Sequence, residues 1–216
     1  MLNNKSWVER NFSKQYLNIL HKHIMKLSLG KKKEICQEIE RDADILAKEN
    51  NAMVVDKASR THLGMTALVL ASYRVLMSRI GDSEKVVNIL ENTFKAVGQR
   101  WIKLYITLML LLSRDPFKKM IQMSKKRVIN NYGKTFEFEY SGDGLNDFTI
   151  ATKKCFYKDF FDSYGIPVLT RVFCSGDENW FNEIKPDKHG FRFERPTTLG
   201  YGGSECPFTF TRVKKD

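Results

Sequence analysis

The residues best suited to chemistry gather in the last third of the chain. Cys174 is followed three residues later by Asp177, while Arg195 and Cys206 flank a turn rich in glycine. A thiolate can act as a nucleophile or a metal ligand, and a guanidinium group can hold an anion. Cys155 adds a third thiol upstream in the same half. Any chemistry of this chain is therefore expected in its C-terminal part.

The stretch 191–208 organises these residues. Its alternating apolar and charged residues predict a strand, and a second alternating run begins at Cys206. Between them, Gly200, Gly202 and Gly203 permit backbone angles that other residues avoid and allow the main chain to approach a ligand closely. The sequence predicts two strands joined by a turn whose N–H groups are available as donors.

Charge is distributed unevenly along the 216 residues, whose net charge is +11. Residues 1–134 hold 25 Lys/Arg against 12 Asp/Glu, whereas residues 135–216 hold 11 against 13. A basic half is consistent with a nucleic acid, an anionic membrane surface or a solvated face. No zinc-finger spacing or RNA-binding aromatic motif is present, so nucleic-acid binding is expected less than a solvated face.

Four cysteines in a chain of this length do not form a disulfide scaffold. The first residues lack the apolar core of a signal peptide. The most apolar run, 101–112, is interrupted by Lys103 and is shorter than the ~18 residues of a membrane span. We therefore expect a cytoplasmic protein with reduced thiols, no membrane partner and a small-molecule ligand.

Apolar spacing predicts a helical first part. Apolar residues recur there at intervals of three to five, which is the spacing of one helix face. The predicted helices cover 5–27, 31–50, 61–80, 83–112 and 117–129, with Gly30 and Gly98 as breaks. Helix 61–80 is apolar nearly all round and should be buried, capped by Ser59 or Thr61. Cys36 and His62 are interpreted as structural residues within these helices.

The periodicity changes after Gly133. Alternation predicts strands near 136–140, 148–152 and 191–213, with short helices near 157–164 and around Trp180 and a loop at 186–190. The predicted fold class is α+β: a helical N-terminal part, 1–134, followed by a small antiparallel sheet with short helices, 135–216. The two parts are expected to form one compact unit.

The C-terminal motifs resemble those of the L-2-amino-thiazoline-4-carboxylic acid hydrolase family. The resemblance is clear over roughly 148–210 and looser over the helices from about residue 60. It rests on Cys155 after a strand, Cys174-Ser-Gly-Asp177 with Trp180-Phe181, Phe193-Glu-Arg195, Thr198-Leu199, and Gly202-Gly203-Ser-Glu-Cys206-Pro-Phe208. The sequence departs from the family pattern at Pro207, where an acidic residue usually follows the cysteine.

The resemblance implies a hydrolase that opens a cyclic amidine bearing a carboxylate and yields an N-carbamoyl amino acid. Arg195 would bind the carboxylate, and Asp177 would stabilise the amidinium. The nucleophile would be water or the thiolate of Cys174 or Cys206, whose pKa would have to be lowered. His189 is the nearest histidine in sequence for acid–base work, and its other interpretation is an exposed loop residue. The remaining expected substrate contacts are Cys155, Thr198, Gly202 and Gly203.

Three alternatives use the same residues. Cys155, Cys174, Asp177 and Cys206 would bind zinc if the fold brought them together, although no CxxC pair is present and the first expectation is no cofactor. The thiols would otherwise be inert and buried. Pro207 favours a non-catalytic protein that binds a small molecule or metal. The sequence leaves a homo-oligomer open.

Overall fold

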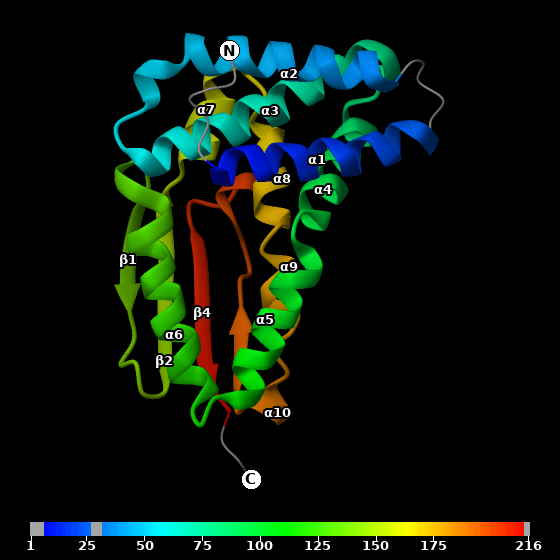
Figure 1. Ribbon diagram of the computed structural model, residues 1–216. Helices are drawn as coiled ribbons and strands as arrows, with labels where there is room; N and C mark the ends of the chain where they lie inside the picture. The colour runs from blue at the N-terminus through cyan, green and yellow to red at the C-terminus, as the bar shows by residue number, and fades with distance from the viewer. Residues whose placement is uncertain (1–6, 27–31, 214–216) are drawn as a thin grey trace.

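A computed structural model describes residues 7–26 and 32–213. Helices α1 and α2 form a layer with α3 across one end of the molecule, and a sheet flanked by helices extends away from this layer (Figure 1). The helical segments are α1 (Trp7–Lys26), α2 (Lys32–Glu49), α3 (Lys57–Ile80), α4 (Ser83–Ala96), α5 (Gln99–Leu112), α6 (Pro116–Arg127), α7 (Phe156–Ser163), α8 (Thr170–Ser175), α9 (Glu178–Phe181) and α10 (Pro186–His189). The α+β class is confirmed.

The described strands form one antiparallel sheet in the order β1-β2-β4-β3. They are β1 (Glu137–Ser141), β2 (Asp147–Lys154), β3 (Phe191–Glu194) and β4 (Cys206–Arg212). In the register of β2 with β4, Thr152 lies opposite Cys206, so the last residues of β2 and the first residues of β4 lie at the same end of the sheet. That end of the sheet faces the helical layer (Figure 1).

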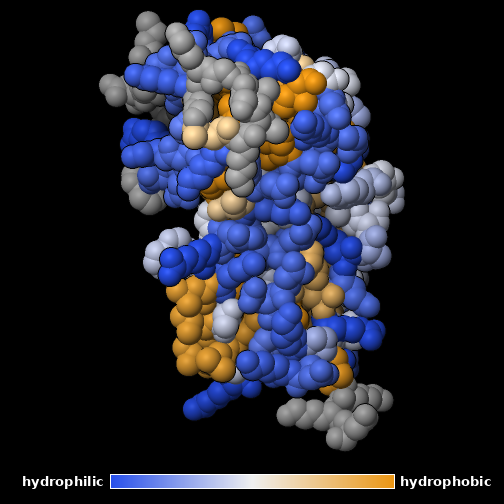
Figure 2. Space-filling view, turned by 90° about the vertical axis from the view of Figure 1, so that its right-hand side faces the viewer, coloured by the Kyte–Doolittle hydropathy of each residue, from blue (hydrophilic) through white to orange (hydrophobic). Residues whose placement is uncertain are grey.

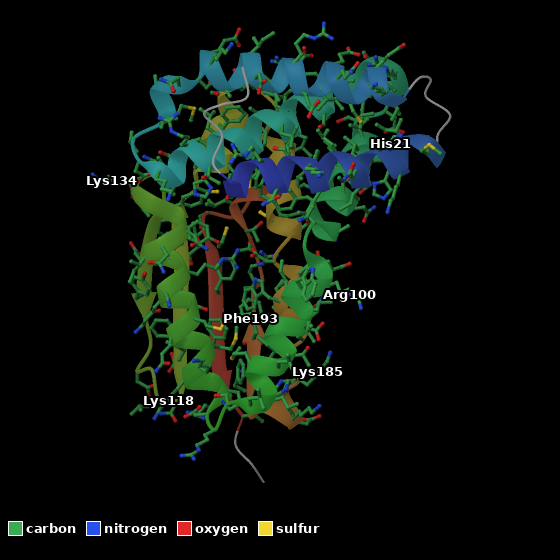
Figure 3. All side chains as sticks on the ribbon, viewed as in Figure 1. His21, Arg100, Lys118, Lys134, Lys185 and Phe193 are labelled. Carbon is green, nitrogen blue, oxygen red and sulfur yellow. The ribbon has the colours of Figure 1, made fainter. Side chains whose placement is uncertain are left out.

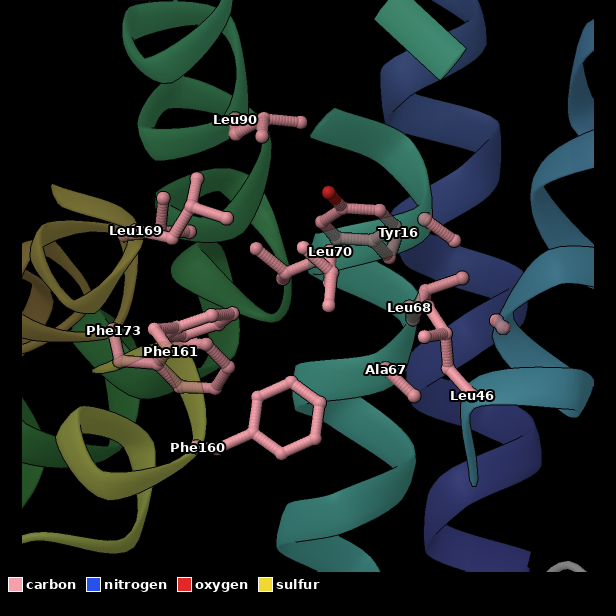
Figure 4. Packing of buried hydrophobic residues seen from close by; sticks show 14 of the residues in the cluster. Tyr16, Leu46, Ala67, Leu68, Leu70, Leu90, Phe160, Phe161, Leu169 and Phe173 are labelled. Carbon is pink, nitrogen blue, oxygen red and sulfur yellow. The ribbon is translucent and has the colours of Figure 1, made fainter. Parts of the chain in front are cut away.

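Helix α3 is the centre of the main core. It is long and apolar enough to cross a membrane, but 56% of its apolar 18-residue stretch is buried inside the protein, as in the core helix of a folded domain. In Figure 4, Leu70 of α3 faces Phe160 and Phe161 of α7 and Leu169. A second cluster of buried residues, which includes Phe117 and Phe210, fills the space between the sheet and helices α5 and α6.

Several predicted boundaries shift in the structure. The break at Gly98 is confirmed, because that residue adopts φ +66° between α4 and α5. Helix α3 begins four residues earlier than predicted, since Asp56 and not Ser59 or Thr61 caps it. The loop predicted at 186–190 contains a single helical turn, α10. The predicted break at Gly30 and the first six residues lie outside the described residues.

Helix α6 does not stop where the sequence predicted. It runs to Arg127 and continues into a π-helical turn, Val128–Tyr132. Gly133 then reverses the chain with φ +66°, and a Cβ at this position would lie 2.4 Å from the Asp56 carboxylate. This turn fixes the directions of Arg127 and Tyr132, which line the same cavity.

Asp56 ties the start of α3 to this turn. Its Oδ1 accepts a hydrogen bond from Ser59 N at 2.7 Å, and its Oδ2 accepts one from Lys134 N at 2.7 Å. Figure 3 shows Lys134 beside the helical layer. These backbone donors, Ser59 first and then Lys134, lower the pKa of Asp56.

We expect Asp56→Ala to lower the free energy of unfolding by about 1–2 kcal/mol at pH 7, because a helix cap is lost. The folded-state pKa of Asp56 lies below its unfolded value, so this stabilisation is present above pH ~4 and disappears as the pH falls through the folded value. Urea unfolding of both proteins at pH 7 and near pH 2.5 measures the difference. Asp82→Ala, which removes the cap of α4 only, is the control. A loss that stays constant down to pH 2.5 would contradict this account.

Candidate functional site

A cavity of about 660 Å³ lies where this end of the sheet meets the helical layer. Its walls come from α1, the α4–α5 junction, the π turn, β2, α7, α8 and the ends of β3 and β4. The sequence-predicted residues that line it are Cys155, Cys174, Asp177, Arg195 and Cys206. The end of the sheet and the short helices α8 and α9 beside it thus bring together residues that lie up to 51 positions apart in sequence.

Arg195 and Asp177 form an ion pair in the cavity wall. Arg195 Nη1 donates to Asp177 Oδ2 at 2.8 Å, and Arg195 Nη2 donates to the Cys174 carbonyl at 3.1 Å. Only 9% of the Arg195 side chain and 15% of the Asp177 side chain is exposed. The guanidinium carbon lies 5.3 Å from the ring centre of Phe181 and 5.5 Å from that of Phe208. Both terminal nitrogens of Arg195 are therefore engaged within the protein.

Asp177 is also occupied on its other oxygen. Trp180 Nε1 donates to Asp177 Oδ1 at 3.1 Å, and Arg127 Nη2 lies 3.8 Å from the same oxygen. The roles expected of Arg195 and Asp177, as partners for a carboxylate and an amidinium, would require them to exchange these contacts for a ligand. In the structure they hold each other.

Arg127 is a cavity residue that the sequence analysis did not identify. It stands at the end of α6 with 48% of its side chain exposed, over the ring of Tyr132 at 5.7 Å. Tyr132 and then Asp177 raise its pKa, so Arg127 carries its charge throughout the physiological range. With Arg195 and Asp177 it gives the cavity wall a net charge of +1. In the sequence, Arg127 is one of many basic residues in 1–134, for which a solvated face was expected.

The three cavity thiols are held in their neutral form. Burial raises the pKa of Cys155 to about 12 and that of Cys206 to about 11, and it raises the pKa of Cys174 as well. A cysteine nucleophile was expected to need a lowered pKa, and the structure gives the opposite shift. The cause is that burial outweighs the nearby Arg195 charge.

The glycine turn packs against the thiols. Leu199 N donates to Cys206 Sγ at 3.1 Å, and Thr198 Oγ1 donates to Cys174 Sγ at 3.4 Å. A Cβ on Gly200 would lie 2.8 Å from Cys174 Sγ. Thr198 is buried behind the cavity, and Gly202 and Gly203 do not line it. Two turn donors therefore serve sulfur atoms, where a ligand had been expected.

His189 lies away from the cavity. It ends α10, just before Phe191, which pairs with Arg212 at the far end of β4. Arg195 follows the opposite end of β3, and four strand residues span ~13 Å. His189 Nδ1 accepts a hydrogen bond from Lys185 N at 2.9 Å. The structure therefore does not bring His189 to the other candidate residues.

A different histidine stands behind the cavity wall. His62 Nδ1 and Tyr157 Oη are 2.9 Å apart, and Tyr157 lines the cavity. His62 is buried, which lowers its pKa to about 4 and leaves it neutral at physiological pH. Burial raises the pKa of Tyr157 well above its usual value. His62 was interpreted as a structural residue of its helix, and no sequence pattern links it to a tyrosine 95 positions later.

The candidate zinc ligands line the same cavity but do not form a metal site. Within residues 7–26 and 32–213, no group of three or more His, Cys, Asp or Glu residues is arranged to hold a metal ion. Asp177 is already paired with Arg195, and Cys206 accepts the Leu199 N–H. The residues present do not fit zinc.

The fold and site define an α+β protein with a partly open, thiol-rich and cationic cavity. The L-2-amino-thiazoline-4-carboxylic acid hydrolase family matches residues 60–210, and the chain belongs to this family. The matched segment contains the cavity residues from Arg127 to Phe208. No curated protein matches the chain.

Solved structures of H-NOX proteins overlap the chain weakly. The unliganded Fe(II) protein from K. algicida has a TM-score of 0.35 at 10% identity, covering 93% of this chain and 96% of the other. The Fe(II)NO protein from S. oneidensis has a TM-score of 0.38 at 11% identity, covering 92% and 98%. Likeness at this level supports no conclusion about function.

We expect the three cavity thiols to react slowly with iodoacetamide at pH 7 and to react faster with each unit of rising pH. Their raised pKa values leave little thiolate at neutral pH. Peptide mapping by mass spectrometry from pH 6 to 10 measures each rate, with glutathione as the reference thiol. A plateau below pH 8 at Cys174 or Cys206 would show an activated thiolate and contradict the structure.

Proposed function

We propose that this protein hydrolyses a small cyclic amidine that bears a carboxylate, of the 2-amino-thiazoline-4-carboxylate type. The observation that carries the proposal is the net positive charge of the Arg127–Asp177–Arg195 group in an otherwise largely apolar cavity. Family membership supports the same chemical class. Such a cavity favours one anionic group attached to an uncharged or weakly basic ring.

Arg127 is the residue that binds the carboxylate. It is the cavity arginine with a half-exposed side chain, and besides its contact with Tyr132 it lies 3.8 Å from Asp177. Arg195, in contrast, donates through both terminal nitrogens to the protein. Arg195 is therefore a positioning residue, which keeps the Asp177 carboxylate in place beside Arg127. A planar guanidinium suits a carboxylate through paired hydrogen bonds.

The attacking group is water. The raised pKa values of Cys155, Cys174 and Cys206 disfavour a thiolate. Water oxygen bonds to the ring carbon between nitrogen and sulfur, and the carbon–sulfur bond breaks. One water proton ends on the ring nitrogen and the other on the departing sulfur. The product is an N-carbamoyl amino acid with a free thiol, so all atoms of substrate and water are accounted for.

Tyr157 relays one of these protons: it gives its hydroxyl proton to the departing sulfur, and the oxygen left behind takes a proton from the attacking water. Tyr157 lines the cavity, and its raised pKa keeps the hydroxyl protonated at neutral pH. His62 fixes the position of this hydroxyl through the 2.9 Å hydrogen bond behind it. A general acid must lie within hydrogen-bond reach of the leaving atom, and a tyrosine that lines the cavity meets this condition.

The departure at Pro207 leaves the cavity unchanged. Successive residues of a strand face opposite sides, and Cys206 and Phe208 both line the cavity. Pro207 therefore faces away from it, opposite Ala151 in β2. The feature that favoured a non-catalytic binding protein thus lies on the other face of the sheet, and that alternative becomes an outcome of the assay.

We expect the purified protein to convert L-2-amino-thiazoline-4-carboxylate to carbamoyl-cysteine, detected by mass spectrometry. Arg127→Met should reduce kcat/KM by about 10- to 100-fold, mainly through KM, because a charged hydrogen bond to the carboxylate is lost. Lys126→Met removes the adjacent exposed charge outside the cavity and is the matched control. Equal losses in both variants would contradict the assignment of Arg127. A thermal shift with this ligand but no product over hours would favour the binding protein.

Tyr157→Phe should lower kcat by about 100-fold and leave KM nearly unchanged, since only the proton donor is lost. Tyr140→Phe, an exposed tyrosine outside the cavity, is the control. His62→Gln should give a smaller loss, because its side-chain amide can still hydrogen-bond Tyr157. Unfolding curves of all three variants exclude a loss of fold. Full activity of Tyr157→Phe would remove this residue from the mechanism.

A further inference from the structure

Helix α5 presents a wide apolar face to solvent. Its inner side is buried through Ile106 and Leu110. Its outer residues are 45–79% exposed: Trp101, Leu104, Tyr105, Leu108, Leu111 and Leu112. Exposed apolar residues scattered singly are ordinary, but a continuous face of this size marks an interaction site. Figure 2 shows it as the orange patch at the lower left, with hydrophilic atoms above and below.

The segment that carries this face, residues 99–134, is strongly basic, although Glu183 also contacts Thr107 of α5. Residues 99–134 contain nine Lys/Arg and one Asp/Glu, which gives +8 of the chain's +11. The one acid, Asp115, is paired with Arg212 at 2.7 Å and lies 3.9 Å from Lys118. Figure 3 shows Arg100 near the start of α5, higher in the view, and Lys118 near the start of α6, at the bottom of the view. The partner of the apolar face must therefore tolerate a large excess of positive charge.

A cationic hollow adjoins the apolar face at the end of α5. It has a volume of about 500 Å³, and Leu110 and Leu111 of α5 are among the residues that line it. The charged or titratable residues that line it are Arg114, Asp115, Lys188, His189 and Arg212. Because Asp115 is neutralised by Arg212, Arg114 and Lys188 keep their positive charges for a ligand. This hollow suits a phosphate-type head group beside apolar chains.

We propose that the outer face of α5, with the basic residues and the cationic hollow beside it, docks the protein on the surface of an anionic lipid bilayer. Aromatic and aliphatic side chains enter the interface, and lysines and arginines bind anionic head groups. The 14 residues of α5 span ~21 Å, against a hydrocarbon core of ~30 Å, so the helix lies on the surface and does not cross it.

Charge argues for a bilayer and against a second copy of the chain. Helix α5 has no acidic residue, so a twofold contact would bring the basic residues of two copies together without an acidic partner on either helix. An anionic bilayer offers the opposite charge over the whole area. This docking differs from the sequence-based expectation of no membrane partner, which rested on the lack of a membrane-spanning run. It is independent of the proposed hydrolase activity.

The test is flotation of the full chain with vesicles of phosphatidylcholine alone or with 30% phosphatidylglycerol, in 0.1 M salt. We expect binding to the anionic vesicles, weakened by 0.5 M salt, and little binding to the neutral ones. Leu108→Ser/Leu111→Ser/Leu112→Ser should weaken binding at least about tenfold. Lys118→Glu/Lys119→Glu should weaken it at least about 25-fold, since each basic residue near such a surface contributes about fivefold.

Matched controls alter exposed residues elsewhere. Ile45→Ser/Val55→Ser and Lys33→Glu/Lys48→Glu change the same chemistry away from this surface and should leave binding within about twofold. Trp101, which is 73% exposed, should shift its fluorescence to the blue on anionic vesicles, and Trp101→Phe should abolish that shift while most binding remains.

Two results would overturn the proposal. One is a lack of flotation with both vesicle types by folded protein. The other is a dimer in analytical ultracentrifugation that the triple leucine variant dissociates, without any vesicle binding. Hydrolase activity measured on soluble substrate in the same preparations separates these outcomes from failure of the proposed function.

Discussion

The site depends on one electrostatic constraint, which is the burial of the Arg195 charge. A guanidinium that is only 9% exposed must be compensated, and Asp177 and the Cys174 carbonyl provide that compensation. These groups belong to the α8–α9 region, whereas Arg195 follows β3, so the pair fixes the sheet edge against the short helices. Removing one partner of such a pair costs about 3–5 kcal/mol because the other charge is left buried.

The same pairing determines which residue remains for a ligand. Because Arg195 and Asp177 satisfy each other, the net charge of the cavity comes from Arg127. The position of Arg127 depends in turn on the π turn after α6, on Gly133 and on the Asp56 carboxylate that anchors the chain beyond it. The cavity chemistry therefore rests on a buried ion pair and on a backbone irregularity more than 40 residues away in sequence.

The sequence predicted the features that follow from local patterns. Alternation identified the strands, helical spacing identified most helices, and residue types identified Cys155, Cys174 and Cys206 as cavity residues. It missed Arg127 and the His62–Tyr157 pair, because a π turn and a contact across 95 positions leave no periodic signal. It proposed His189 for acid–base work because that histidine is the nearest in sequence, although His189 and Arg195 lie at opposite ends of β3. The raised thiol pKa values depend on burial, which the sequence pattern does not specify.

Residues 99–134 contribute to both the cavity and the proposed docking surface. Their inner side lines the cavity through Ile102, Arg127 and Tyr132, and their outer side carries the apolar face of α5 and the exposed lysines of α6. A segment with a net charge of +8 raises the local concentration of anions near the cavity before any contact is made. A carboxylate ligand and an anionic bilayer are thus attracted by one field. Salt that screens the lysines would weaken bilayer docking more than ligand binding, because Arg127 lies in a cavity wall where screening is less effective.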